Sequence, residues 1–171
     1  MKNLISILVL FFFIAIGSSY HCFSQITITF VPSSGTSLSS FDVNNILANY
    51  TTDQLADGFI ADIDASVTSI GAFAFRNNNY LLSVIANSVT STGSTVFRNC
   101  ILLKSVDLPL LTTTHLGEFQ NCVSLESVSF GTGFTTPTNI NFSNFIFDGV
   151  TTTEVDLTLG HNVLPERDGN F

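Results

Sequence analysis

Histidine is the side chain best suited to acid–base catalysis at neutral pH, yet neither His115 nor His161 stands in a catalytic motif. The chain has no Gly-x-Ser-x-Gly elbow to present a nucleophile and no His-Glu-x-x-His pair to hold a metal beside a base. The Gly-Thr-Gly run at residues 131–133 lacks the remaining glycines and the following helix of a dinucleotide site. The sequence therefore predicts a protein that is not an enzyme and takes no cofactor.

Two pairs of carboxylates offer the oxygen ligands that calcium prefers. Asp62 and Asp64, and Glu154 and Asp156, each place two acids on one face of an expected strand. No calcium-loop motif surrounds either pair. We interpret both as solvent-facing charges that keep a strand soluble, and we predict no metal site.

Cys100 and Cys122 are the third group with reactive chemistry, and they stand 22 residues apart. Three segments of that length align without a gap: residues 66–87, 88–109 and 110–131, of which the second reads "SVTSTGSTVFRNCILLKSVDLP". The shared columns contain Phe75, Phe97 and Phe119; Asn77, Asn99 and Asn121; Leu81, Leu103 and Leu125; Val84, Val106 and Val128. A fixed period of 20 to 29 residues is typical of a leucine-rich repeat solenoid, in which stacking of the repeats creates the core.

Each repeat carries the elements that such a stack needs. In "LKSVDL", apolar residues alternate with Ser105 and Asp107, as in a short strand with one buried face. "SVTS" indicates a second, shorter extended segment, and an asparagine such as Asn99 can satisfy the backbone groups of a tight turn. His115 replaces the glycine of this segment in the third repeat, where we expect the segment to be weaker.

The alternation also predicts which residues the strands expose. One outward column contains Ser83, Ser105, Ser127 and Glu154, and the next contains Ile85, Asp107, Ser129 and Asp156. Because solenoids commonly bind protein partners across such a surface, we predict a partner-binding face made of Ser105, Asp107, Ser127, Ser129, Glu154 and Asp156. The same residues would also suit a protein that is merely soluble.

These repeats resemble the BspA-like leucine-rich repeats found on the surfaces of bacteria such as Bacteroidetes and in some protists. The resemblance rests on "SVTSIGAFAF", "RNC", "QNC", "LKSV" and "LESV", which recur across residues 66–131. It implies a secreted or cell-surface protein that mediates protein binding or adhesion. It also implies that the cysteine column consists of buried thiols, although the spacing of neighbouring strands would permit a disulfide.

The segments on either side extend the solenoid. Residues 133–160 suggest a fourth, lengthened repeat in which Val155 and Leu157 take the places of Val128 and Phe130, giving about four repeats of 22 residues. Residues 25–65 suggest an N-terminal cap and first rung: a strand in "QITITFVP", a helix with apolar residues at 43, 46, 47 and 50, and a strand from residue 59. Residues 161–171 suggest a partial or truncated last rung. The alternative function is therefore that of a structural fragment without a ligand, which associates with itself through this end.

Residues 1–24 have the layout of a secretory signal peptide: Lys2, an apolar run from Leu4 to Ile16, then small residues. Acylation of Cys22 is the alternative, although Tyr20 and His21 stand where that processing requires small residues. Removal of Lys2 leaves four cationic side chains against thirteen carboxylates, a net charge of −9. We therefore predict an exported protein without a membrane span that does not bind nucleic acid.

Overall fold

The computed structural model describes residues 25–115 and 117–132, together with the backbone of residues 156–159. The proposed signal peptide, Glu154, His161 and the proposed last rung at 161–171 lie outside these residues. None of the described helices is long and apolar enough to cross a membrane.

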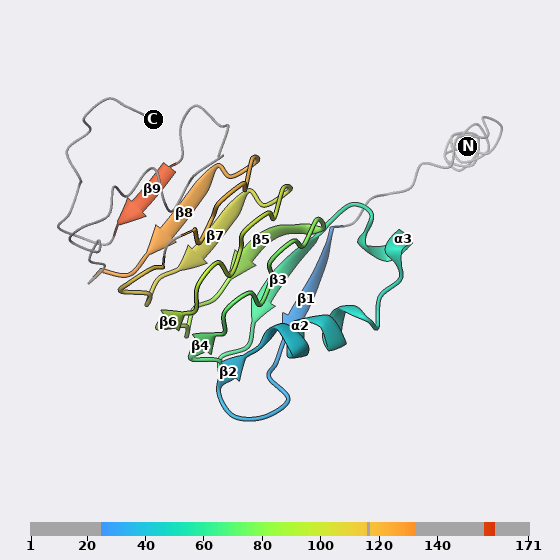
Figure 1. Cartoon of the computed structure of the whole chain (residues 1–171), viewed down its shortest axis with the longest axis horizontal. Coiled ribbons are helices and arrows are strands. Elements are labelled where there is room, and N and C mark those ends of the chain that lie inside the picture. The colour runs from blue at the N-terminus through green and yellow to red at the C-terminus, as the bar shows by residue number, and fades with distance from the viewer. Residues whose placement is uncertain (1–24, 116, 133–155, 160–171) are drawn as a thin grey trace, which may run out of the picture.

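A long parallel sheet forms one side of the molecule (Figure 1). Its strands follow the order β1 (Ile26–Phe30), β3 (Phe59–Ile63), β5 (Leu81–Ile85), β7 (Ser105–Leu108), β8 (Ser127–Phe130) and β9 (Asp156–Leu159). From β5 to β8, each residue pairs with the residue 22 positions along the chain, for example Val84 with Val106 and Val106 with Val128. The predicted solenoid of short parallel strands is confirmed.

A second, shorter sheet lies opposite the first in the earlier turns of the solenoid (Figure 1). It consists of β2 (Ser37–Leu38), β4 (Ser69–Ile70) and β6 (Ser91–Thr92), all parallel. The strands β4 and β6 are the extended segments predicted from "SVTS". Residues 110–115 of the next repeat form no strand, as expected from the loss of glycine at His115.

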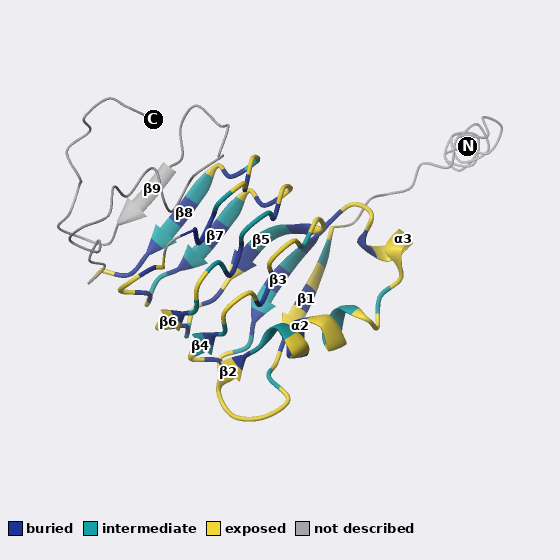
Figure 2. Cartoon of the chain, in the orientation of Figure 1, coloured by how far each residue is buried: buried dark blue, intermediate teal, exposed yellow. Residues whose placement is uncertain are grey.

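The core fills the space between the two sheets, and Figure 2 shows that buried residues recur in every described strand of the long sheet from β1 to β8. Phe75, Phe97 and Phe119 are almost fully buried, and their rings stack from one rung to the next. The centroids of Phe75 and Phe97 are 5.9 Å apart, and those of Phe97 and Phe119 are 5.5 Å apart with nearly parallel planes. No single repeat could enclose such a column, so the core exists only in the stack.

A turn with a fixed polar network precedes the strands β5, β7 and β8 of the long sheet. Asn77, Asn99 and Asn121 all have φ near 60°, a left-handed conformation that asparagine tolerates better than most residues. The Nδ2 of Asn99 donates to Oδ1 of Asn77 at 2.7 Å, and the Nδ2 of Asn121 donates to Oδ1 of Asn99 at 2.9 Å. The asparagines thus satisfy one another across the rungs.

The N-terminal segment closes one end of the sheet with β1 and a capped helix. The helix α2 (Ser40–Leu47) begins at Ser39, whose side chain accepts from the backbone of Asp42 while Asp42 accepts from the Ser39 backbone. Its apolar side buries Val43 and packs Ile46 and Leu47 against the core, which confirms the predicted helix, while Tyr50 packs against the core from beyond the helix end. A second helix, α3 (Thr52–Leu55), leads into β3.

The register of the last strand corrects one prediction. Asp156 pairs with Ser127, Leu157 with Val128 and Leu159 with Phe130, so the expected alignment of Val155 with Val128 is wrong by two residues. Asp156 consequently belongs to the column of Ser127 rather than that of Ser129, and Thr158 takes its place. The long insertion carries no periodic column by which to place the strand.

Candidate binding face

The outward residues of the long sheet form a surface, here called the strand face, with two parallel columns. From β3 to β8, the described side chains in it are Ile60, Asp62, Ser83, Ile85, Ser105, Asp107, Ser127 and Ser129. Most are half-buried by their neighbours, whereas the Val and Leu or Phe residues between them are buried. Alternation along β7 and β8 therefore sorts their side chains as predicted, whereas β5 departs from it at Leu82 and Ser83, which are both half-buried.

The structure brings the predicted site residues together in pairs. Ser105 lies opposite Ser127, and Asp107 lies opposite Ser129. The hydroxyls of Ser83 and Ser105 are 2.6 Å apart and share a hydrogen bond, so part of the hydroxyl column is engaged with itself. Asp156 follows Ser127 in register at the backbone level, whereas Glu154 lies outside the described residues.

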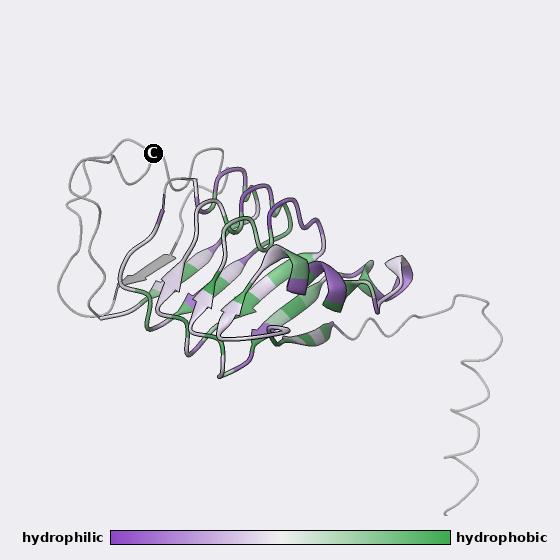
Figure 3. Ribbon diagram, turned by 60° about the horizontal axis from the view of Figure 1, so that its bottom comes forward, coloured by the Kyte–Doolittle hydropathy of each residue, from purple (hydrophilic) through white to green (hydrophobic). Residues whose placement is uncertain are grey.

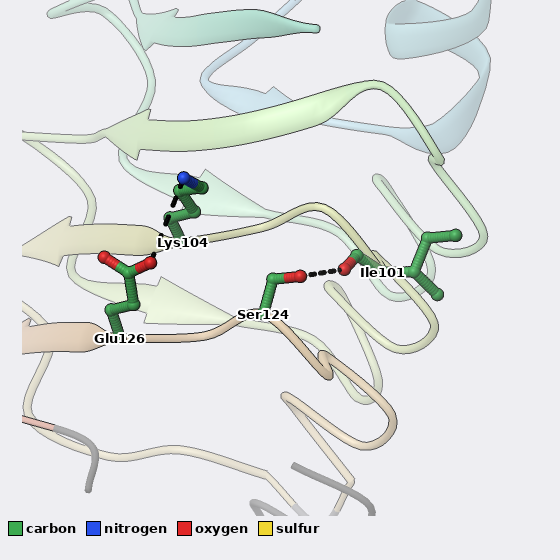
Figure 4. Close-up of polar contacts among 4 residues, drawn as sticks. All are labelled: Ile101, Lys104, Ser124 and Glu126. Atoms are coloured by element: carbon green, nitrogen blue, oxygen red, sulfur yellow. Dashed lines mark hydrogen bonds and ion pairs between the residues drawn. The ribbon is translucent and has the colours of Figure 1, made fainter. Parts of the chain in front are cut away.

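An ion pair borders the hydroxyl column (Figure 4). Nζ of Lys104 lies 3.9 Å from Oε1 of Glu126, and the side chains are 59% and 64% exposed. An exposed pair of this kind contributes little to stability, about 0 to 1 kcal/mol. Because Lys104 is paired with an acid, the carboxylates of Asp62 and Asp107 leave this surface with negative charge.

A row of exposed apolar residues lies beside the strand face, where the turns enter the strands. We call it the apolar ridge: Tyr80, Ile101, Leu102 and Val123, each between 36% and 42% exposed. Two of its turns are tied together by the Ser124 hydroxyl, which donates to the carbonyl of Ile101 at 2.7 Å (Figure 4). Sequence reasoning missed this ridge, although apolar residues recurring beside the turn asparagines were a readable signal.

The ridge lies in the same turns as hydrophilic residues such as Asn99 and Asn121. Figure 3 shows hydrophobic and hydrophilic residues interleaved along the strands, with hydrophilic residues gathered on a row of turns along one edge. An exposed apolar patch on a protein surface commonly marks an interaction site. The ridge offers a partner apolar contacts, and the strand face offers polar groups that can orient it.

The cysteines are free, buried thiols, in agreement with the interpretation drawn from the resemblance. Sγ of Cys100 donates to the carbonyl of Phe75, and Sγ of Cys122 donates to that of Phe97, each at 3.0 Å. Burial raises the pKa of both thiols, that of Cys122 to about 12. These thiols are therefore protonated and stabilise the core rather than act as nucleophiles.

The other candidate groups have local roles where they are described. The Asp64 carboxylate accepts from the backbone and hydroxyl of Ser66, and these bonds lower its pKa. The backbone N–H of Gly131 donates to the carbonyl of Leu111 at 3.0 Å, as a turn residue does. His115 is exposed beside the buried Thr114. Within the described residues, no three acid, histidine or cysteine side chains converge to hold a metal ion.

Comparisons with known proteins bear on the fold and the family. The model of the BspA type Leucine rich repeat region (6 copies) matches residues 60–163. A leucine-rich cell surface protein from Faecalibacterium prausnitzii has a similar structure, with a TM-score of 0.54 and 19% sequence identity. The match covers 82% of this chain and 36% of that protein. The chain has no match among curated proteins. At this identity, the structural likeness shows the fold alone.

Proposed function

The chain belongs to the BspA-type leucine-rich repeat family, and from that membership we propose that it is a secreted or cell-surface protein that binds a protein partner. The contact surface is the strand face together with the apolar ridge. The observation that carries the proposal is the ridge, because four exposed apolar side chains border an ordered polar sheet. Apolar and aromatic anchors supply most of the energy of protein interfaces, whereas hydroxyls and charges mainly fix register.

The chemistry of the face favours an extended partner with basic groups. Asp62 and Asp107 stand on the exposed side of the strands, and the one lysine nearby is paired with Glu126. Opposite charge steers association and makes its rate dependent on salt. A nucleic acid or an anionic membrane would meet repulsion at this surface. The role is one of binding or adhesion, without catalysis.

A pull-down with matched variants tests this function. Purified protein without residues 1–24 is incubated with extracts of extracellular matrix and cell surfaces, and captured proteins are identified by mass spectrometry. Leu102→Asp and Asp107→Arg should each abolish specific capture, because one removes an anchor and the other reverses the charge of the face. Asp53→Arg makes the same charge change on exposed α3 and should leave capture intact.

The alternative is a structural surface protein that associates only with itself. Sedimentation of the same samples at increasing concentration distinguishes the two functions. Self-association without capture would contradict the binding function. Capture that all three variants retain would contradict the strand face and ridge as the contact surface.

A further inference from the structure

Glu118 is a carboxylate inside the core, at a position that the other repeats fill with apolar residues. Its column contains Ala74 and Val96, both buried. Glu118 is 0% exposed, and neither of its carboxylate oxygens has a hydrogen-bond partner. Burial of an unpaired ionised carboxylate is costly, so this residue breaks the rule that the rest of the column follows.

The surroundings of Glu118 are polar but do not neutralise it. Thr92 on β6 and Thr114, one repeat later, are both buried, and their hydroxyls also lack hydrogen-bond partners. The hydroxyl of Thr92 and the backbone of His115 lower the pKa of Glu118 slightly without forming hydrogen bonds of normal geometry. Desolvation outweighs both and raises the pKa to about 8.

The ionisable neighbours of Glu118 favour its neutral carboxyl. Cys122 lies in the same rung, and a charge on Glu118 raises the pKa of its thiol. His115 and Glu126 are the other titratable residues of this rung, and both side chains are exposed, while the backbone of His115 approaches Glu118. No cationic side chain is among the described groups that influence the carboxyl. The Thr92 hydroxyl and the His115 backbone are therefore the only described groups that favour the ionised form, and desolvation outweighs them.

We infer that Glu118 makes the rung formed by residues 110–131 a proton-stabilised unit, which is closed with the carboxyl neutral and opens when the carboxyl ionises. In the closed rung the carboxyl keeps its proton above the pH at which an exposed glutamate loses it. The folded state thus binds more protons than the open state between about pH 4.5 and 8. Stability of the rung is greatest below this range, falls as pH rises through it, and levels off above it.

The direction is opposite to that of the other described carboxylates with shifted pKa values. Hydrogen bonds lower the pKa of Asp42 and of Asp64, and both groups favour the folded state as pH rises. Those residues lie in the N-terminal part of the chain. The pH response of the rung at 110–131 can therefore be distinguished by its sign as well as by its place.

Cys122 provides a local probe of the rung, because its thiol is 0% exposed when the rung is closed. The full chain is treated briefly with a maleimide between pH 5 and 9, and labelling of the Cys100 and Cys122 peptides is quantified separately by mass spectrometry. Division of the wild-type rate by that of Glu118→Gln at each pH removes the intrinsic reactivity of the thiol. Glu118→Val, which copies Val96, serves as a second non-titrating variant if the amide fails to fold.

For Cys122, the ratio should rise by about tenfold per pH unit between pH 5 and 7 and level off above about pH 8. For Cys100, in the preceding rung, the ratio should change much less. A Cys122 ratio that stays constant from pH 5 to 9 would overturn the inference. An equal rise at both cysteines would overturn it too, since the opening would then involve the whole solenoid.

Discussion

Thr95 has a backbone φ of 53°, a conformation that β-branched residues rarely adopt. The same column contains Phe73 with φ 64° and Gly117 with φ 69°. All three described repeats thus place a left-handed residue here, and only the third of them supplies glycine. The Thr95 hydroxyl is also buried without a partner, so this residue carries two unfavourable features.

We predict that Thr95→Gly stabilises the protein by about 0.5 to 1 kcal/mol, as relief of strain exceeds the added entropy of the unfolded chain. Urea denaturation measures the change. Ser94→Gly is the matched control, since Ser94 has no positive φ and its replacement should lower stability. Equal effects of the two substitutions would show that the left-handed turn stores no strain.

At the scale of elements, the asparagine turns perform two tasks that substitution can separate. Asn99 supplies a left-handed backbone and also bonds both neighbouring asparagines through its side chain. Glycine preserves the first task and removes the second, whereas alanine removes both.

We expect Asn99→Ala to be less stable than Asn99→Gly by about 1 kcal/mol, and both to be less stable than wild type. Chemical denaturation of the three proteins gives the comparison. If glycine restored wild-type stability, the hydrogen bonds between asparagines would contribute nothing to the stack.

The cap of helix α2 should make the protein less stable as the pH falls. The carboxylate of Asp42 accepts from the backbone of Ser33 and Ser39 at 2.9 Å each, and together with the Ser33 and Ser39 side chains these bonds hold its pKa well below the usual range. A lowered pKa stabilises the fold above the unfolded value near 4, and this contribution is lost as pH falls through the folded value.

Asp42→Asn should therefore lower stability by about 1 kcal/mol at pH 7, and the difference from wild type should shrink below about pH 4. Denaturation curves at pH 7 and pH 3 provide the measurement. A loss of the same size at both values would show that the carboxylate charge has no part in the cap.

At the scale of the whole molecule, aromatic rings connect both ends of the described core. Phe30 contacts Phe75 at 5.1 Å between centroids, the column continues through Phe97 and Phe119, and Phe119 reaches Phe130 at 6.5 Å. Loss of one ring from the middle removes packing on two sides.

Phe97→Ala should accordingly cost about 3 to 5 kcal/mol, since it opens a cavity at a residue that is 0% exposed. Lys104→Ala, on the exposed side of the same rung, should change stability by no more than about 0.5 kcal/mol. Equilibrium unfolding compares the two variants. Similar losses of stability in both variants would contradict the placement of Phe97 in the core and of Lys104 on the surface.

The periodic part of this fold is readable from sequence because each column repeats its physical role. Val106 and Phe97 are predictable as core residues, and Asn99 as a turn residue, since two aligned copies stand in the same positions. The register of β9 is not, because a non-periodic insertion separates it from β8. The short strand β2 was not predicted for a related reason. Its pairing with β4 depends on how the turns stack, and its sequence is not part of the aligned repeats.

The candidate surface, too, is predictable from the sequence only in part. Alternation in the strands indicates that Ser105 and Asp107 face outward, but it does not reveal the Ser83–Ser105 hydrogen bond. The exposed positions of Ile101 and Leu102 depend on how the turns project from the stack. The alignment of Glu118 with Val96 indicates that Glu118 is buried, but a charged residue is not normally expected in a core, so the position was not predicted.

The side-chain hydrogen bonds between the described rungs run in one direction, whereas the backbone N–H groups of Phe75 and Phe97 donate the other way, to carbonyls of the next rung. Asn99 and Asn121, Cys100 and Cys122, and Ser124 each donate from a later rung to an acceptor on an earlier one. Continuing the stack in the same register would join the later end of one copy to the earlier end of the next, so the copies would meet head to tail. Such an assembly would extend as an open filament unless its rotation closed a ring.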